Sequence, residues 1–208
     1  MKKIATLWIA AAPLLIGACQ NNQAGNNLAA ANNVASAVPA NTAAAAPAPA
    51  PAPQSGLELR LSGSGLTAGQ PGLHPSNVYS FGMPRAQIVA AITAIRGPAT
   101  GQDANAECGA GPMQFTHFGT LSLNFQDGRW VGWSLIGPPA SPPLRTDWDL
   151  GIGSPRTGLD DGDNDQAEIS QTSLGTEFSV SDVQGLLSGN GANATVTNLW
   201  AGADCIFR

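Results

Sequence analysis

The stretch from Gln20 to Gly56 contains no charged residue, and this limits where in the chain a fold can form. Asn and Ala dominate its first part, and Ala alternates with Pro from Ala46 to Pro53. Such a composition buries too little apolar surface to offset the conformational entropy of the chain, so we expect a disordered linker over residues 19–56. The globular fold is then confined to residues 57–208, a length of about 150 residues that suits one domain.

The first residues have the layout of a secretion signal. Met1-Lys2-Lys3 gives a short basic start, an apolar run from Ile4 to Ile16 follows, and two small residues lead to Cys19. The apolar run has 13 residues and contains Pro13. A membrane-spanning helix needs about 20 apolar residues, so we predict a cleaved signal peptide over residues 1–18 instead of a retained anchor.

The end of this signal resembles the lipobox of bacterial lipoproteins. Ile16-Gly17-Ala18-Cys19 carries the resemblance, with Ile16 in place of the more usual leucine. It implies cleavage before Cys19, and diacylglycerol and palmitate on that residue. In bacteria with two membranes, the absence of Asp after the cysteine favours the outer membrane, with the domain facing the periplasm. The inner membrane, the cell surface, and an ordinary secretory signal with a chance cysteine stay open as alternatives.

With Cys19 assigned to lipid, the remaining cysteines are an even pair, Cys108 and Cys205. In an oxidising compartment such a pair indicates a disulfide. The bond would close a loop of almost 100 residues, for which the chain-entropy argument gives about 4.7 kcal/mol as an upper figure. A nucleophilic Cys108 is the weaker alternative, because the sequence shows no histidine partnered with it.

The charge balance excludes several kinds of partner. Both lysines, Lys2 and Lys3, lie in the signal, which leaves seven of nine basic residues against fourteen acidic ones and a formal charge of −7. A net acidic domain argues against nucleic-acid binding. It also gives no reason to lie on an anionic lipid surface. No glycine-rich phosphate-binding motif appears, which disfavours nucleotide-dependent enzymes.

The clearest helix signal begins at Pro84, a residue suited to the first helical position. Ile88, Ile92 and Ile95 follow at spacings of four and three, which predicts one buried helix face. Gly97-Pro98 then ends the pattern.

A hairpin is predicted after this helix, from alternating apolar residues over 121–125 and 131–135. A three-residue Gln126-Asp127-Gly128 loop would place the apolar side chains of both strands on one side, whereas a two-residue Asp127-Gly128 loop would not. We therefore predict the three-residue loop. It leaves Trp130 on the opposite face of the hairpin, as the candidate for an exposed binding surface.

The second half echoes the first. Gly153-Ser154-Pro155-Arg156 resembles Gly82-Met83-Pro84-Arg85, which gives a hypothesis of internal duplication. The other predicted elements are strands over 113–117, 176–180, 194–199 and 203–207 and a short helix over 181–187. We expect an α+β fold, in which a small antiparallel sheet packs against one or two helices.

A family resemblance follows from three short motifs in order, Phe81-Gly82-Met83-Pro84-Arg85, Gly97-Pro98 and Phe125-Gln126-Asp127-Gly128-Arg129. They resemble the group of the smallest lipoprotein of the barrel-assembly machinery, whose fold is shared by the beta-lactamase inhibitory protein. The resemblance covers residues 81–135 and implies an α+β sandwich that binds protein and performs no catalysis. It gives no residue a binding role.

An acidic cluster raises the question of calcium. Asp161, Asp163 and Asp165 have the alternate spacing of the first three ligands of a calcium loop. Gln166 stands where such a loop needs glycine, and Thr172 stands where it needs a bidentate glutamate. A solvated acidic turn is the interpretation we favour, a weak calcium site is the alternative, and no other cofactor is expected.

No catalytic residue is predicted, because neither histidine has a partner at a spacing that indicates a ligand or a base. We expect a lipid-anchored envelope protein with a non-catalytic binding or structural domain, whose partner is a protein or another envelope component. The alternative is a periplasmic hydrolase whose site is assembled from scattered residues such as His117, Asp147 and Asp149.

Overall fold

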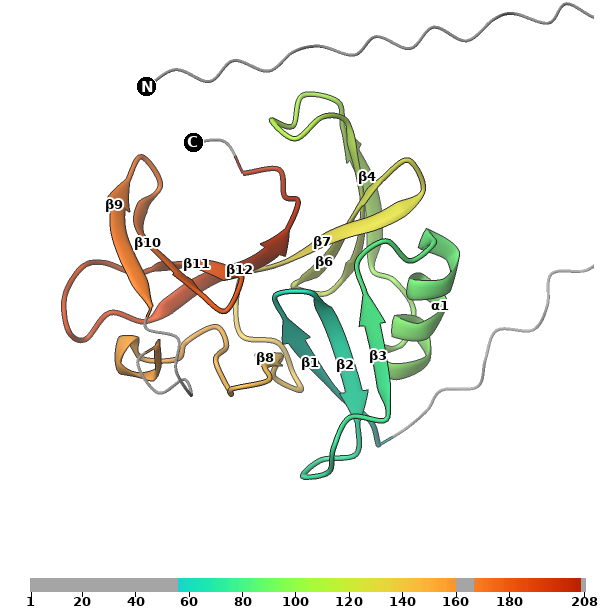
Figure 1. The fold of residues 1–208 in the computed structure, drawn as a ribbon, viewed down its shortest axis with the longest axis horizontal. Coiled ribbons are helices and arrows are strands. Elements are labelled where there is room, and N and C mark those ends of the chain that lie inside the picture. The colour runs from blue at the N-terminus through green and yellow to red at the C-terminus, as the bar shows by residue number, and fades with distance from the viewer. Residues whose placement is uncertain (1–55, 160–166, 207–208) are drawn as a thin grey trace, which may run out of the picture. The chain divides into compact units, whose positions relative to one another are not determined.

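The structure is a computed structural model that describes residues 56–159 and 167–206, which hold twelve β-strands in two sheets and one α-helix (Figure 1). In chain order the elements are β1 (Glu58–Ser62), β2 (Gly65–Gly69), β3 (Asn77–Ser80), α1 (Arg85–Arg96), β4 (Gly101–Asn105), β5 (Met113–Phe118), β6 (Leu121–Gln126), β7 (Arg129–Ile136), β8 (Arg145–Thr146), the short 3₁₀ helix η1 (Arg156–Leu159), β9 (Glu168–Thr172), β10 (Gly175–Val180), β11 (Val183–Leu187) and β12 (Val196–Gly202).

The larger sheet consists of two four-stranded meanders joined edge to edge. Its strand order is β4-β5-β6-β7-β12-β11-β10-β9, and all of its neighbouring strands are antiparallel. The two meanders meet where β12 pairs with β7, with Leu199 opposite Leu135. Figure 1 shows the β4–β7 half in green to yellow and the β9–β12 half in orange to red.

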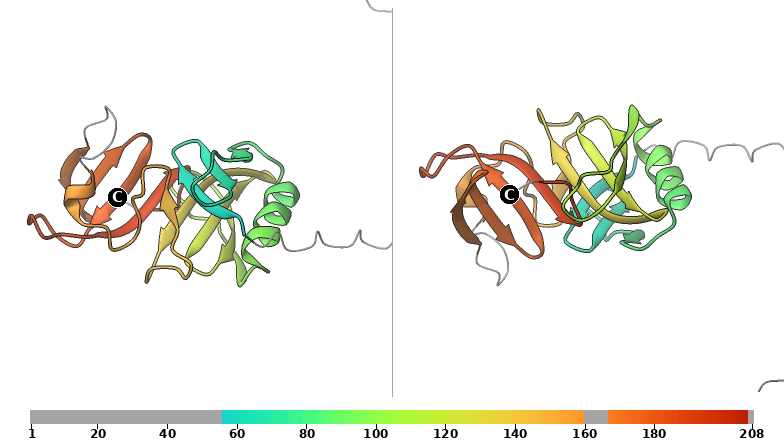
Figure 2. Two further views of the ribbon diagram at one scale, coloured as in Figure 1. Left: turned by 90° about the horizontal axis from the view of Figure 1, so that it is seen from below. Right: turned by 90° about the horizontal axis from the view of Figure 1, so that it is seen from above.

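The smaller sheet has the order β3-β2-β1-β8 and covers one face of the β4–β7 half. The two views in Figure 2, from opposite sides, place β1–β3 in front of these strands in one and behind them in the other. Leu59 and Leu61 alternate with polar residues along β1 and join the common hydrophobic core. The Trp133 indole Nε1 donates a hydrogen bond of 2.9 Å to the Ser62 carbonyl, which ties the two sheets together.

The two faces of the larger sheet differ sharply in character. The covered face carries core side chains such as Leu123, Trp133 and Leu199, all 0% exposed. Side chains alternate along a strand, so the ladder register assigns the intervening residues to the other side, here called the open face. The residues on the open face include Asp103, Phe115, His117, Ser122, Asn124, Ser134, Ile136, Trp200, Gln184, Glu177 and Glu168.

The predicted helix is confirmed as α1. Pro84 stands at its N-cap, and Gly97 ends it with φ of 87°, a left-handed conformation that glycine adopts without steric cost. Ile88 and Ile92 are 0% exposed, as the spacing requires.

The predicted α+β fold class is wrong, because the described residues are mostly β and hold one α-helix. The helix predicted over 181–187 is a turn followed by β11. Ser181 and Asp182 have φ of 48° and 62°, so they form a tight reversal between β10 and β11 where the prediction placed a helix start. The prediction also missed β1 to β3, although Leu59 and Leu61 show the alternation of a half-buried strand.

The predicted three-residue hairpin loop is also wrong. Asp127 and Gly128, with φ of 49° and 72°, form a two-residue turn, and Phe125 pairs with Trp130. A β-bulge between Asn124 and Phe125 in the pairing then adds one residue to β7. The extra residue restores the register, so the apolar sets of both strands share the covered face even though the turn is short.

The repeated Gly-x-Pro-Arg tetrapeptide makes the same three backbone hydrogen bonds in each half. In the first half the bonds run from Gly82 N to Trp130 O, from Trp130 N to Met83 O and from Arg85 N to Gly128 O. In the second they run from Gly153 N to Val196 O, from Val196 N to Ser154 O and from Arg156 N to Ala194 O. The two halves thus share this junction as well as the four-stranded meander.

A binding hollow on the open face

The last described residues cross the open face of the larger sheet. β12 ends at Gly202, and residues 203–206, here called the C-terminal strap, turn over the β4–β7 half. Gly132 on β7 makes this crossing possible. A Cβ at Gly132 would overlap the Ala203 carbonyl oxygen and lie 2.9 Å from the Ala203 nitrogen. Any side chain at this position would therefore displace the strap.

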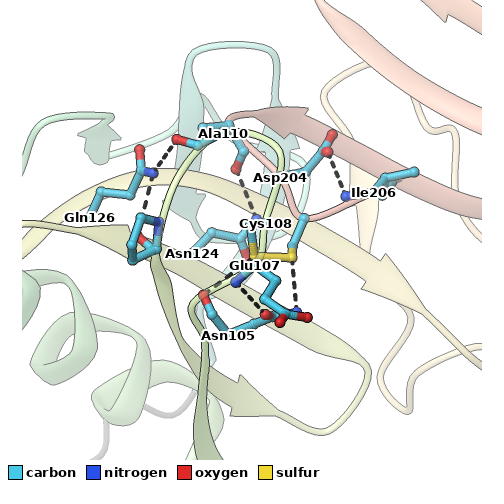
Figure 3. The surroundings of a disulfide bond; sticks show 11 residues. Asn105, Glu107, Cys108, Ala110, Asn124, Gln126, Asp204 and Ile206 are labelled. Atoms are coloured by element: carbon cyan, nitrogen blue, oxygen red, sulfur yellow. Dashed lines mark hydrogen bonds between the residues drawn. A yellow bond between two sulfur atoms is a disulfide. The ribbon is translucent and has the colours of Figure 1, made fainter. Parts of the chain in front are cut away.

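Three hydrogen bonds and a disulfide hold the strap in place, of which Figure 3 shows the disulfide and the contact that Asn105 makes to it. The Ala203 N–H donates to the Val131 carbonyl at 2.8 Å, and the Asn124 amide Nδ2 donates to the Ala203 carbonyl at 3.0 Å. The predicted Cys108–Cys205 disulfide is confirmed and joins the strap to the loop after β4. Asn105 Nδ2 adds a contact of 3.4 Å to the Cys205 sulfur.

A hollow of about 550 Å³, here called the strap hollow, lies between the strap and the β4–β7 half of the open face. The strap contributes Asp204, Cys205 and Ile206 to one side. The residues that line the remainder include Asp103, Phe115, His117, Thr120, Ser122, Asn124, Ser134 and Ile136. A volume of this size is within the range of small-ligand pockets, about 300–1,000 Å³.

The floor of the strap hollow contains buried polar atoms that have no partner in the described part of the chain. Thr120 Oγ1, Ser122 Oγ and Asn124 Oδ1 all lack a hydrogen bond. Asn124 as a whole is 1% exposed. Buried polar groups in proteins are nearly always hydrogen-bonded, so the cluster of three unpartnered atoms makes this hollow the candidate site.

A histidine–carboxylate pair stands at the side of the hollow. His117 Nε2 lies 3.1 Å from Asp103 Oδ2. Ser122 is directly opposite His117 in the β5–β6 ladder, but its hydroxyl makes no hydrogen bond to any described residue. A base activates a serine nucleophile through a hydrogen bond, and no such bond joins Ser122 to His117 among the described residues.

A second hollow of about 390 Å³ lies on the β9–β12 half of the open face. Glu168, Glu177, Gln184 and Trp200 are among the residues that line it. The Trp200 indole Nε1 donates to Gln184 Oε1 at 2.9 Å. No lysine or arginine of the described residues lines this hollow or the strap hollow.

The prediction that Trp130 belongs to an exposed binding surface is wrong. Trp130 is 0% exposed, because the bulge turns its side chain onto the covered face. Its ring packs edge-on against Phe81 with centroids 4.8 Å apart, and its Nε1 donates to the Gly132 carbonyl at 2.7 Å. The tryptophan is a core residue with its polar atom satisfied.

The scattered residues of the hydrolase alternative do not meet. His117 lines the strap hollow, whereas Asp147 lines a different hollow beside β1 and β2 and accepts a hydrogen bond from Thr67 at 3.0 Å. Asp149 is paired with Arg60 at 3.4 Å.

Other predicted sites lie outside the described residues. These are the lipidation site Cys19 and the calcium candidates Asp161, Asp163 and Asp165. Within residues 56–159 and 167–206, no group of three or more His, Cys, Asp or Glu side chains is arranged to hold a metal ion. In the same part of the chain, no helix has the length and apolar character needed to cross a membrane.

The sequence reasoning missed the residues of the strap hollow. Ser122 and Asn124 alternate with the apolar residues of the predicted strand over 121–125, which suits the outward side of a half-buried strand, and their polarity gave no other signal. The available clue was Gly132, a glycine inside an otherwise apolar strand, which indicates a close approach by another backbone. The prediction did not use it.

Comparisons with known proteins place this chain in no family. A scan against protein-family profiles and a search of curated protein sequences give no match. Among solved structures, the chain is similar to the uncharacterized protein yfeY from Escherichia coli, at 13% sequence identity, over 55% of this chain and 86% of that chain. The TM-score of 0.38 is too low to carry an argument about fold or function.

Proposed function

We propose that this chain is a lipid-anchored envelope protein whose β-domain binds a basic protein partner through the open face of the larger sheet. The lipobox at Cys19 and the charge-free linker after it support a membrane anchor and a tether. Outer-membrane anchoring with the domain in the periplasm is the location that this signal favours. The observation that carries the binding role is the open face, which has two hollows that contain carboxylates and, among residues 56–159 and 167–206, no lysine or arginine.

The open face has the size of a protein contact. Eight strands at a spacing of about 4.8 Å span about 34 Å. Strands of about 17–20 Å in length then give a face of about 600–700 Å². Each partner in a standard protein interface contributes about 800 Å², so this face supplies a share of one side together with the strap that covers part of it.

The charges on the open face indicate a basic partner. Asp103 and Asp204 line the strap hollow, and Glu168 and Glu177 line the second hollow. Opposite charge on a partner accelerates association and fixes its orientation, so lysine and arginine side chains are the expected counterparts. Screening by salt then weakens the complex, because the Debye length falls to about 8 Å at physiological ionic strength.

Site-specific photo-crosslinking in bacterial cells tests this proposal. A photoreactive amino acid replaces Ile136, which is 52% exposed on the open face. The matched control replaces Val78, which is 71% exposed on β3 of the smaller sheet. We expect adducts from position 136 that contain a partner peptide rich in Lys or Arg, and we expect none from position 78. Equal adducts from both positions, or a partner peptide without basic residues, would refute the proposal.

A further inference from the structure

Asn124 places a buried hydrogen-bond acceptor in the floor of the strap hollow. Its amide Nδ2 donates to the Ala203 carbonyl at 3.0 Å, whereas its Oδ1 has no partner within residues 56–159 and 167–206. The reverse amide orientation would place Asn124 Oδ1 against the Ala203 carbonyl oxygen, and two acceptors repel each other. The strap therefore fixes Oδ1 as the amide atom without a partner among the described residues. Leaving a buried acceptor unpaired costs free energy, and a donor from a ligand would remove that cost.

The remaining groups of the hollow make it rich in acceptors and poor in cations. Ser122 and Thr120 contribute unpartnered hydroxyl oxygens, and Asp103 and Asp204 contribute carboxylates. In the part of the chain that the structure describes, no lysine or arginine lines the hollow. Asp103 is paired with His117, and Asp204 Oδ1 accepts a hydrogen bond from the Ile206 N–H. The hydroxyl and amide oxygens are therefore the atoms that lack a partner among the described residues. A ligand that satisfies these oxygens must carry N–H or O–H donors, and the two carboxylates beside them favour a positively charged one.

We propose that the strap hollow receives the guanidinium group of an arginine side chain from the basic partner, an inference that rests on the proposed function. A guanidinium presents five N–H donors in one plane, enough to reach Asn124 Oδ1 and the hydroxyl of Ser122 at once. A lysine ammonium concentrates three donors at one point and reaches fewer of these atoms. Phe115 lines the same hollow, and aromatic rings attract guanidinium groups.

A pair of small probes tests the inference without the partner. Nα-acetyl-L-arginine methylamide represents an arginine within a chain, and the citrulline counterpart has nearly the same shape but no charge. Calorimetric titration of the oxidised mature chain, with Cys19→Ala to avoid lipid, measures both at low ionic strength. We expect saturable binding of one arginine probe per chain and affinity for the citrulline probe at least about tenfold lower.

Substitutions locate the binding within the hollow. Asn124→Leu removes the open acceptor and lowers affinity about tenfold, but it also removes a strap hydrogen bond. Ser122→Ala removes none of the hydrogen bonds described for the strap and lowers affinity about threefold. Asp103→Asn lowers affinity as well, whereas Asp147→Asn, an identical charge change at a different hollow, leaves it within about twofold of the wild type.

The outcomes separate this inference from the proposed function. Equal binding of the arginine and citrulline probes, or unchanged affinity in both Ser122→Ala and Asn124→Leu, overturns the arginine site. If crosslinks from position 136 persist in that case, the open face still binds a partner and only the inference fails. If the arginine probe binds but position 136 gives no adduct, the proposed function fails, and with it the assignment of the arginine to a protein partner.

Discussion

Gly132→Ala is the substitution that tests the position of the C-terminal strap most sharply. The new methyl group would overlap the Ala203 carbonyl oxygen, and it would lie 2.8 Å from the Ala201 oxygen and 2.9 Å from the Ala203 nitrogen. All three atoms belong to the backbone, so the clash cannot be relieved by a side-chain rotation. Overpacking costs about 1–3 kcal/mol, and the two strap hydrogen bonds at risk are worth about 0.5–1.5 kcal/mol each. Alanine recovers about 0.5–1 kcal/mol of backbone entropy, which leaves a net loss of about 3 kcal/mol.

Thermal and urea unfolding of the oxidised mature chain measure this loss. A decrease of about 3 kcal/mol corresponds to a fall in Tm of about 6–12 °C for a domain of this length. Gly158→Ala is the matched control, because a Cβ at Gly158 meets no atom within 4 Å and its φ lies outside the left-handed region. We expect the control to stay within about 0.5 kcal/mol of the wild type. A Gly132→Ala variant as stable as this control would refute the strap geometry.

Three further outcomes are expected. Replacing both Cys108 and Cys205 with Ala lowers the free energy of unfolding by about 2–4 kcal/mol in denaturant titration, because the bond closes a loop with a sequence separation of 97; no change would contradict a stabilising crosslink. Ser122→Ala raises stability by about 1 kcal/mol in the same assay, since it removes a buried hydroxyl that has no partner among the described residues; a loss would mean that the hydroxyl is satisfied in the free protein. Globomycin, which blocks lipoprotein signal cleavage, leaves the uncleaved precursor on a gel if Cys19 is lipidated, whereas normal processing in the drug would refute the anchor.

The first half of the fold was largely predictable from local patterns. The spacing of Ile88 and Ile92, together with the proline at the start and Gly97 at the end, is sufficient to predict α1 and both of its ends. The alternation of apolar and polar residues along β6 and β7 predicted the hairpin but not the length of its turn. The bulge that corrects the register depends on how the two strands pack on the rest of the core. The spacing of apolar residues in the sequence does not predict such a bulge.

The second half was less predictable because its local signals compete. The Gly-Ser-Pro-Arg motif that ends at Arg156 repeats the junction before α1, but Gly158 follows where α1 has helix formers, and only η1 forms. Residues 183–187 carry apolar residues that suit either a strand or a short helix. The turn at Ser181 and Asp182 makes this segment a strand, because both residues have positive φ. Neither residue is a glycine, the residue type that indicates positive φ in a sequence.

The candidate site was not predictable from its own residues. Asn124 and Ser122 are ordinary polar residues on the outward side of a strand until the strap covers them. That cover depends on Gly132, on the Cys108–Cys205 disulfide and on the path of the chain after β12. These are contacts between distant segments. The sequence indicated the disulfide, and Gly132 indicated that some backbone approaches β7, but not which one.

The central claim, that the open face binds a basic partner, is tested most directly by the crosslink yield at position 136 in two charge-reversed variants. Glu168→Lys replaces a negative charge with a positive one in the second hollow of the open face. Asp147→Lys makes the same change of charge in a hollow beside β1 and β2. The account predicts that Glu168→Lys strongly reduces the adduct and that Asp147→Lys leaves its yield unchanged. Equal yields in both variants, with the folded state intact by circular dichroism, would contradict it.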